Sequence, residues 1–213
     1  MIDYLLKRDY FTQDELDGIW AEIDNLQRVR AFIPPEESGS ARENGVILKQ
    51  NSAVFFHQVY THPRYSPTIH AVRKMFNGVT GEYASKSLWN RGILQTSASS
   101  TMLSYYENSD HYKAHYDSSV VTVLHWLWKE PKSFEGGELT LVDTGEKIPL
   151  TNNTMLMFPS CCIHEVSPVI MDAESIGKGL GRYCITTFLY NTFDHDAGYL
   201  YFTDPDARKK ERF

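Results

Sequence analysis

The run Val120-Val-Thr-Val-Leu-His-Trp-Leu-Trp128 is the strongest strand signal in the chain, because it concentrates β-branched and aromatic residues. Five further runs of this kind lie between about residues 97 and 191, separated by turns rich in Gly, Asn, Asp and Ser. They are Thr101–Tyr106, Glu138–Val142, Thr154–Phe158, Val166–Ile170 and Tyr183–Tyr190. Many short strands with regular turns are typical of a sandwich or a barrel, so we expect this half of the chain to form one antiparallel β fold.

The N-terminal part shows helical patterns instead. Thr12-Gln-Asp-Glu15 has the spacing of a capping box, and apolar residues then recur at helical intervals. This pattern predicts an amphipathic helix from about Gln13 to Val29. A second helix is expected over Ser66–Phe76, with Gly78 and Gly81 ending it.

Length and composition suit one ordinary folded domain. The chain has 213 residues, of which 42% are hydrophobic, and this is enough to bury a real core. We therefore expect a single domain over residues 1–213, mainly β with N-terminal helices. Its helical N-terminal part spans about residues 1–96, its β core about 97–191, and a C-terminal tail covers 192–213.

The charge balance and the cysteines narrow the class of protein further. With 27 acidic against 21 basic residues the net charge is −6, which argues against a nucleic-acid-binding surface. Cys161, Cys162 and Cys184 do not form a disulfide framework, as expected in a reducing compartment. The N-terminus is charged, and no stretch has the roughly 18 apolar residues of a membrane helix. We expect a soluble, cytoplasmic protein without nucleic-acid or membrane partners.

His115-Tyr-Asp117 is the first candidate for a functional site. Side chains two positions apart on a strand point to the same face, so His115 and Asp117 can bind one metal ion together. His164, just after the strand that ends at Phe158, supplies a third ligand. Two histidines and a carboxylate form the facial triad of non-haem Fe(II) oxygenases, which leaves positions open for dioxygen and a chelating cosubstrate. For the His-x-Asp pair alone, the alternative is two exposed polar residues on a strand edge.

Arg182 strengthens the oxygenase interpretation. It begins the last strand-like run, and its guanidinium can bind a carboxylate through two parallel hydrogen bonds in a closed pocket. Thr186 lies on the same face by the two-residue period, so its hydroxyl can share that carboxylate. Taken alone, an arginine at a strand start is a surface charge.

Together these residues resemble the 2-oxoglutarate and Fe(II)-dependent dioxygenases, and most closely the prolyl 4-hydroxylase-like branch. The matching stretches run in family order across about residues 97 to 191, roughly half of the chain. They are Leu103-Ser-Tyr-Tyr106, Tyr112-Lys-Ala-His115-Tyr-Asp117, Thr122-Val-Leu-His-Trp-Leu127, Phe134-Glu-Gly-Gly-Glu-Leu139, Met157-Phe-Pro159, His164-Glu-Val-Ser-Pro-Val169 and Gly181-Arg-Tyr-Cys-Ile-Thr186.

The resemblance implies a fold, a ligand set and cosubstrates. The fold is a double-stranded β-helix, a jelly-roll variant with the metal in its mouth. The metal is Fe(II), bound by His115, Asp117 and His164, and no catalytic residue is expected beyond these ligands. Arg182 binds the distal carboxylate of 2-oxoglutarate. Tyr106 resembles the tyrosine whose hydroxyl assists it, and an inward-facing core aromatic is the alternative. Dioxygen is the second cosubstrate, and ascorbate belongs to the same set of ligands.

Two aromatic positions and one loop are less clear. Phe188 falls where the branch carries an aromatic beside the substrate, although the sequence alone favours core packing. Trp126 replaces a second cosubstrate-binding tyrosine, and an indole cannot accept a hydrogen bond, so Trp126 is expected, like Phe188, to lie close to the substrate. The connection from His164 to Arg182 is longer than usual for the branch, through Met171–Gly181. Its three glycines make this insert a candidate mobile flap, although a plain surface loop is favoured.

The resemblance implies hydroxylation of an unactivated C–H bond, with a prolyl residue in a peptide or protein as the first candidate substrate. A free amino acid or another small molecule is the alternative within the class. Two other classes stay open: a Zn(II) hydrolase, since zinc accepts the same ligands, and a non-catalytic jelly-roll binding module. A carboxylate clamp of Arg182 and Tyr106 argues against the hydrolase, and an intact ligand set argues against the binding module.

Overall fold

The structure is a computed structural model that describes residues 2–39 and 41–191. The tail expected at 192–213 lies outside the described residues. The helices are α1 (Gln13–Arg28), α2 (Phe56–Val59), α3 (Pro67–Arg73) and α4 (Val79–Lys86), with 3₁₀ turns η1 (Pro63–Tyr65), η2 (Lys74–Phe76) and η3 (Trp89–Gln95). The strands are β1 (Leu5–Lys7), β2 (Arg42–Glu43), β3 (Val46–Ile47), β4 (Ser52–Phe55), β5 (Ala98–Tyr106), β6 (Tyr112–His115), β7 (Val121–Leu127), β8 (Glu135–Gly136), β9 (Leu139–Leu141), β10 (Glu146–Ile148), β11 (Thr154–Pro159), β12 (His164–Val166), β13 (Val169–Ile170) and β14 (Arg182–Tyr190).

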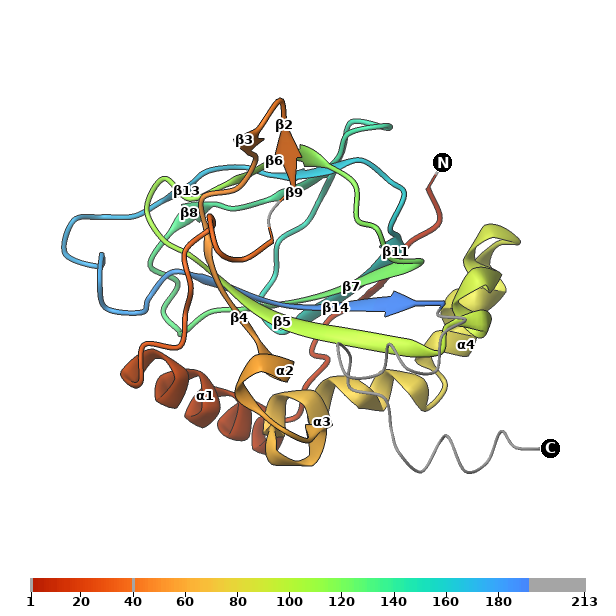
Figure 1. Ribbon diagram of the computed structural model, residues 1–213, viewed down its shortest axis with the longest axis horizontal. Coiled ribbons are helices and arrows are strands. Elements are labelled where there is room, and N and C mark those ends of the chain that lie inside the picture. The colour runs from red at the N-terminus through yellow and green to blue at the C-terminus, as the bar shows by residue number, and fades with distance from the viewer. Residues whose placement is uncertain (1, 40, 192–213) are drawn as a thin grey trace.

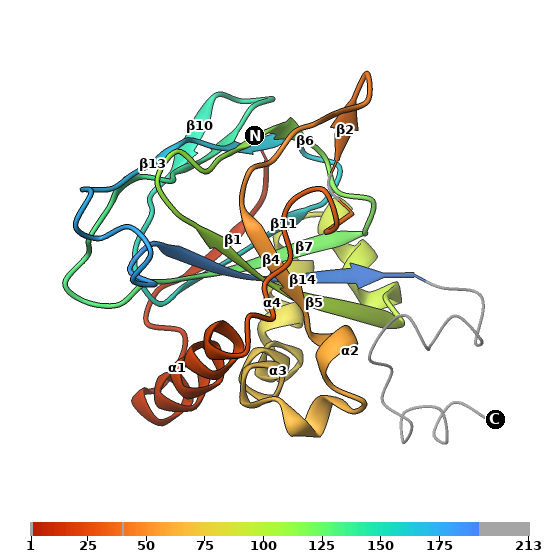
Figure 2. The same cartoon turned by 60° about the vertical axis from the view of Figure 1, so that its left-hand side comes forward.

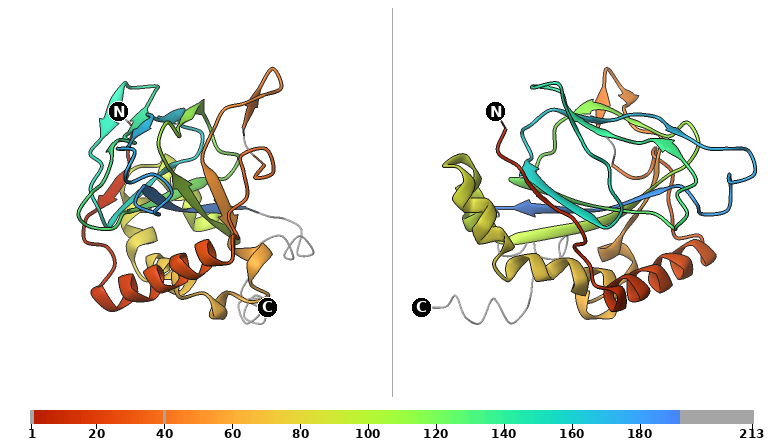
Figure 3. Two further views of the ribbon diagram at one scale, coloured as in Figure 1. Left: turned by 90° about the vertical axis from the view of Figure 1, so that its left-hand side faces the viewer. Right: turned by 180° about the vertical axis from the view of Figure 1, so that it is seen from behind.

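Two antiparallel sheets face each other, so the prediction of a mainly β protein is confirmed. The larger sheet has the order β1-β11-β7-β14-β5-β4, and the smaller has the order β10-β9-β12-β6. Figures 1 and 2 show α1, α2 and α3 together on one side of the larger sheet and the smaller sheet on its other side. The views from the side and from behind in Figure 3 agree. The larger sheet is therefore covered on both faces.

The alternation of side chains along the central strands explains why both faces are apolar. On β7, Leu124 and Trp126 face the smaller sheet and pack in one core with Leu139 and Leu141. Leu127, on the opposite face, packs in a second core with the buried side of α1 and α3. A strand buried on both faces reads as a continuous apolar run in the sequence. The cavity described below opens between the two sheets.

The prediction of the first helix is confirmed in detail. Thr12 accepts a hydrogen bond from the backbone N–H of Glu15, and the Glu15 carboxylate accepts one from the backbone N–H of Thr12. The second predicted helix is α3 followed by the 3₁₀ turn η2. Gly78 does end this region, with a positive φ of 97°, but Gly81 lies inside α4 instead of stopping a helix. No helix in the described part of the chain combines the length and apolarity needed to span a membrane.

Two strand predictions need correction. The run Val166–Ile170 is split into β12 and β13, which pair with different strands, because Ser167 and Pro168 interrupt it. The N-terminal part is not purely helical, since β1 pairs with β11 and β4 pairs with β5. Both are short edge strands of the larger sheet, and partners far along the chain decide whether such segments pair.

Candidate active site

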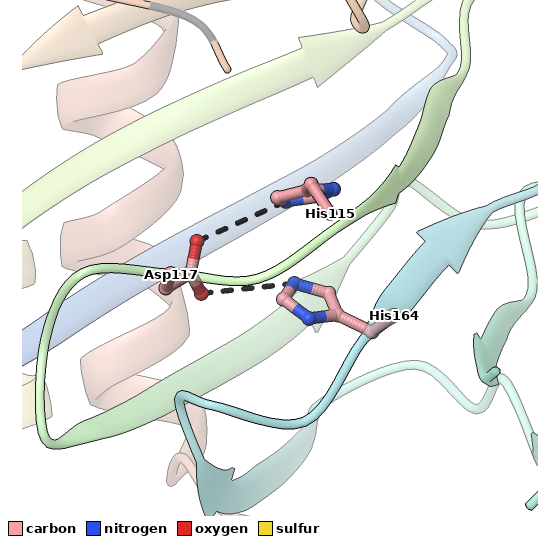
Figure 4. A group of neighbouring side chains, drawn as sticks. All are labelled: His115, Asp117 and His164. Carbon is pink, nitrogen blue, oxygen red and sulfur yellow. Dashed lines mark ion pairs between the residues drawn. The ribbon is translucent and has the colours of Figure 1, made fainter. Parts of the chain in front are cut away.

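Three side chains converge in the space between the sheets (Figure 4). His115 ends β6 and His164 begins β12, and the two residues are direct cross-strand partners. Asp117 lies between them, with its carboxylate oxygens 3.8 Å from His115 Nε2 and 3.6 Å from His164 Nε2. The three ligand atoms lie within 4.8 Å of one another, and no other group of three or more such ligands was found among residues 2–39 and 41–191. The predicted triad is thus assembled in space.

The hydrogen bonds of the two histidines leave the correct atoms free for a metal ion. His115 Nδ1 lies 2.8 Å from the carbonyl oxygen of Lys113, and His164 Nδ1 lies 3.0 Å from that of Cys162. A carbonyl only accepts, so Nδ1 must carry the proton in each ring and Nε2 keeps its lone pair. Histidines that bind metals are commonly oriented by such a bond.

Burial shifts the pKa values of His115 and Asp117. It lowers the pKa of His115 to about 3, with a further contribution from neighbouring His164. Burial also raises the pKa of Asp117, opposed by His164 and by the hydrogen bond from Thr122. Both histidine rings are at most 8% exposed. Two buried imidazoles beside a desolvated carboxylate form a donor set that suits a divalent cation.

Asp117 does not lie on the strand, contrary to the sequence prediction. Strand β6 ends at His115, and Asp117 follows in the loop. Its position is held instead by a chain of hydroxyl groups, in which Thr122 Oγ1 donates to Asp117 Oδ2 at 2.6 Å. Ser160 Oγ lies 2.8 Å from Thr122 Oγ1, and the Asp117 backbone N–H donates to the Ser160 carbonyl oxygen at 3.0 Å. Strand β7 and the residue that follows β11 therefore orient the carboxylate.

Replacing Thr122 by Val should weaken metal binding by about tenfold to hundredfold, because groups that orient a metal ligand have effects of this size. The isosteric side chain keeps the packing of β7 but removes the donor to Asp117. Isothermal titration calorimetry with Mn(II) measures the change. Thr140→Val on β9, outside the cavity, is the matched control. Equal affinities in wild type and Thr122→Val would show that Asp117 is positioned by its backbone alone.

A cavity of about 790 Å³ extends from the triad between the sheets. A volume in this range holds a small-molecule ligand with space to spare. Its polar lining includes the three predicted metal ligands, the buried cations Lys49 and Arg182, and the hydroxyl groups of Tyr106, Tyr112 and Thr186. Met102, Leu124, Leu139 and Phe188 are among its apolar lining.

Arg182 is the most unusual residue of this lining. Its side chain is 0% exposed, and none of its three nitrogen atoms has a hydrogen-bond partner in the described part of the chain. Its Cζ lies 4.8 Å from the ring centroid of Tyr106 and 5.9 Å from that of Trp126. A buried cation without a partner is costly by several kcal/mol, so a site of this kind is built for an anion that arrives from outside.

Gly136 and Gly137 belong to the Glu-Gly-Gly motif, and Gly137 lies against the side chain of Arg182. Gly137 has a positive φ of 74°, and a Cβ atom there would lie 2.8 Å from Arg182 Cδ. Only a residue without a side chain leaves room for the arginine chain at this point. The Glu-Gly-Gly motif thus forms one wall of the space that holds Arg182.

We expect Gly137→Ala to raise the KM of the anionic ligand of Arg182 by about tenfold, because the added methyl group displaces the arginine and disturbs its charge-assisted hydrogen bonds. Gly145→Ala is a matched control, since Gly145 also has a positive φ (69°) but nothing lies within 4 Å of its added Cβ. Both variants carry the backbone strain of a left-handed alanine. The same rise in KM in both would mean that strain, and not contact with Arg182, is responsible.

The remaining predicted residues lie in three different surroundings. Thr186 lies on the same face of β14 as Arg182 and lines the cavity, as does Tyr106, whose pKa is raised by burial. Phe188 lines the cavity at the metal end, where it pairs in register with Thr122. Trp126, expected beside the substrate, instead packs beside the guanidinium and is not among the residues that line the cavity.

The segment from Met171 to Gly181 does not reach the cavity. None of its residues is among those that line it. The segment is held at the helix-covered side of the larger sheet, where the backbone N–H of Gly177 donates to Glu107 and the carbonyl oxygen of Gly179 accepts from Tyr183. These contacts favour the surface loop over the flap.

Sequence patterns did not reveal four residues that line or support the site. Thr122 and Ser160 act through Asp117, and Tyr112 stacks on His115 with ring centroids 3.6 Å apart. Lys49 comes from the segment between β3 and β4, far from the family motifs. The only sequence feature that points to any of these four residues is the position of Tyr112, three residues before His115. This spacing can be interpreted only when the pairing of strand β6 is known.

Comparison with known proteins agrees with this geometry. Residues 101–190 match the family model of the 2OG-Fe(II) oxygenase superfamily. An uncharacterised PKHD-type hydroxylase of Synechocystis sp. is 32% identical over 182 residues, which cover 73% of this chain and 58% of the relative. The chain thus spans less than two thirds of that relative.

Solved structures show the same fold. A prolyl hydroxylase of Trichoplax adhaerens, in complex with a hypoxia inducible factor peptide fragment, matches with a TM-score of 0.64 and 17% sequence identity. The match covers 90% of this chain and 84% of the Trichoplax chain. A Pseudomonas putida prolyl-4-hydroxylase has a TM-score of 0.62 and 13% identity, covering 90% and 94%. Residues 101–190 of the chain therefore belong to the 2OG-Fe(II) oxygenase superfamily. Its fold is similar to that of the prolyl hydroxylases.

Proposed function

We propose that this protein is a 2-oxoglutarate-dependent Fe(II) dioxygenase that hydroxylates an unactivated C–H bond. A prolyl residue in a peptide or protein is the first candidate substrate, and a free amino acid or another small molecule is the second. The proposal includes a double-stranded β-helix as the framework, since two facing antiparallel sheets with the triad between them suit that architecture. It also includes a single domain over residues 1–213.

One observation carries the proposal: a fully buried arginine with no hydrogen-bond partner in the described part of the chain shares a cavity with the three metal ligands. A Zn(II) hydrolase needs the ligands but has no use for a buried guanidinium beside them. A cosubstrate that carries two carboxylates explains both features, because one end can reach the metal while the other satisfies Arg182.

The residues of the chain would divide the work as follows. His115, Asp117 and His164 would hold Fe(II) on one face and leave the other face to ligands. Arg182 would bind the distal carboxylate of 2-oxoglutarate, with Tyr106 and Thr186 as hydroxyl neighbours in the same cavity. Phe188 would pack against the substrate at the metal end. Apolar walls such as Met102 and Leu124 would exclude water from the reacting atoms.

Bound Fe(II) and 2-oxoglutarate supply the oxidising chemistry, in which 2-oxoglutarate and dioxygen become succinate and carbon dioxide while one oxygen atom enters the C–H bond. The protein contributes geometry to this reaction. Holding the substrate carbon near the metal gives a large rate advantage, because the reacting groups no longer have to meet by diffusion.

Mass spectrometry tests the proposal directly. The protein is incubated with Fe(II), 2-oxoglutarate and ascorbate, together with proline-containing peptides and free amino acids. We expect 2-oxoglutarate-dependent release of succinate and a mass increase of one oxygen atom in the substrate. Omitting ascorbate shows whether it is required. Absence of succinate under all conditions, with Fe(II) bound, would contradict the oxygenase and favour the binding module.

A further inference from the structure

Lys49 is a second buried cation in the same cavity, and neither the triad nor the proposed cosubstrate site accounts for it. It lies between β3 and β4, is 3% exposed and lines the cavity. The backbone around it is fixed against β6, since Lys113 N–H donates to the Leu48 carbonyl oxygen at 2.8 Å. Lys49 itself forms a β-bridge with Tyr112. The ammonium group is therefore carried by an anchored segment.

The ammonium group has no anionic partner in the described part of the chain. Glu43 and Asp117 also line the cavity, but neither forms an ion pair with Lys49. It lies over an aromatic face instead, with Nζ 5.9 Å from the ring centroid of Tyr112. Burial lowers the pKa of Lys49 to about 8. A buried ammonium gains most from an anion that the protein itself does not provide.

The two buried cations are attached to different parts of the cavity. Arg182 packs against Tyr106 and Trp126, at the start of β14. Lys49 packs against Tyr112, whose ring stacks on the metal ligand His115. A cosubstrate whose distal carboxylate is bound by Arg182 has its other end at the metal. It has no third anionic group left for Lys49.

We propose that Lys49 binds a carboxylate of the primary substrate, so that the substrate of this oxygenase is an acid. The inference rests on the proposed function and makes its substrate class more specific. Two sources supply the required chemistry: a free amino acid or related small acid, and a peptide that presents an acidic side chain or its terminal carboxylate. The cavity of about 790 Å³ has space for such a group in addition to a small cosubstrate.

A matched pair of small probes tests the charge requirement without turnover. The protein is loaded with Mn(II) and saturating 2-oxoglutarate without dioxygen, so that Arg182 is already occupied. It is then titrated with cyclopentanecarboxylate and with cyclopentanecarboxamide in a calorimeter. We expect the carboxylate to bind about tenfold to hundredfold more tightly, as charge-assisted hydrogen bonds predict. Equal affinities, or no binding of the carboxylate, would overturn the inference.

Variants of Lys49 assign the effect to this residue. Lys49→Met should remove the preference for the carboxylate, and Lys49→Arg should retain most of it. The affinity for 2-oxoglutarate should change less than threefold in both variants. Lys147→Met, which removes an exposed lysine on β10, should change neither quantity. Weaker 2-oxoglutarate binding in Lys49→Met would mean that Lys49 belongs to the cosubstrate site, which overturns the proposal.

A turnover assay distinguishes the two sources of the carboxylate. Free amino acids are compared with their amides, and proline-containing peptides with Asp are compared with their Asn counterparts. Preferential hydroxylation of free acids identifies a small-molecule substrate, and preferential hydroxylation of Asp peptides identifies a peptide. If the neutral compounds were hydroxylated as well as the corresponding acids, Lys49 would not bind a substrate carboxylate, whereas the proposed oxygenase function would stand. If the wild type consumed no 2-oxoglutarate with any of these compounds, that result would instead count against the proposed function.

Discussion

Single replacement of His115, Asp117 or His164 by Ala should reduce 2-oxoglutarate consumption to the background of the assay while the protein stays folded. Each of the three supplies one of the ligand atoms that lie within 4.8 Å of one another, and two ligands alone do not hold Fe(II) in a facial arrangement. The residues lie at the ends of β6 and β12 and in the adjoining loop, outside the cores that join the sheets and helices. Circular dichroism and succinate release measure the two expectations separately.

The control for these variants is His70→Ala, which removes an exposed histidine of α3 far from the cavity. It should consume 2-oxoglutarate at the wild-type rate. Addition of Mn(II) should raise the melting temperature of wild type and His70→Ala, because a ligand that binds only the folded state stabilises it. It should not stabilise the three ligand variants. A ligand variant that keeps full turnover would remove that residue from the metal site.

The fold was predictable wherever local patterns agree with tertiary pairing. The capping box at Thr12 places the start of α1 correctly, because both of its hydrogen bonds form within four residues. The long strands β7 and β14 also appear close to their predicted bounds, since their apolar runs are buried on both faces. In contrast, β1 and β4 are short edge strands that exist because β11 and β5 offer hydrogen bonds to them.

The candidate site was predictable only in its motif residues. The type and order of His115, Asp117, His164 and Arg182 point to one chemistry, and the structure brings all four to one cavity. The reason given for the His-x-Asp pair was wrong, because Asp117 lies beyond the strand and depends on Thr122 and Ser160. Such support comes from β7 and β11, whose register against each other no local pattern reveals. The sequence did not reveal Lys49 for the same reason, since its position in the cavity depends on a long-range pairing with Tyr112 of β6.

The largest effect on cosubstrate binding is expected from Arg182→Met. Arg182 is completely buried and its donors have no partners in the described chain, so 2-oxoglutarate loses its strongest contact in this variant. Charge-assisted hydrogen bonds are worth about 1.5–3 kcal/mol each, so the Kd should rise at least about hundredfold when a two-bond contact is removed. Arg182→Lys keeps the charge but loses the planar guanidinium group, so its Kd for 2-oxoglutarate should lie between those of the wild type and Arg182→Met.

Without 2-oxoglutarate, Arg182→Met should not lose stability, because Met replaces a buried cation that has no hydrogen-bond partner in the described part of the chain with an apolar chain of similar length. The two effects separate in a melting experiment with Mn(II) and no dioxygen. At a 2-oxoglutarate concentration of about 100 Kd, the wild type gains about 2.7 kcal/mol, or roughly 5–10 °C for a domain of this size. Arg182→Met should gain about 1 °C at that concentration. If 2-oxoglutarate stabilised both proteins equally, Arg182 would not bind it, and the anion that this buried guanidinium requires would have to be a different ligand.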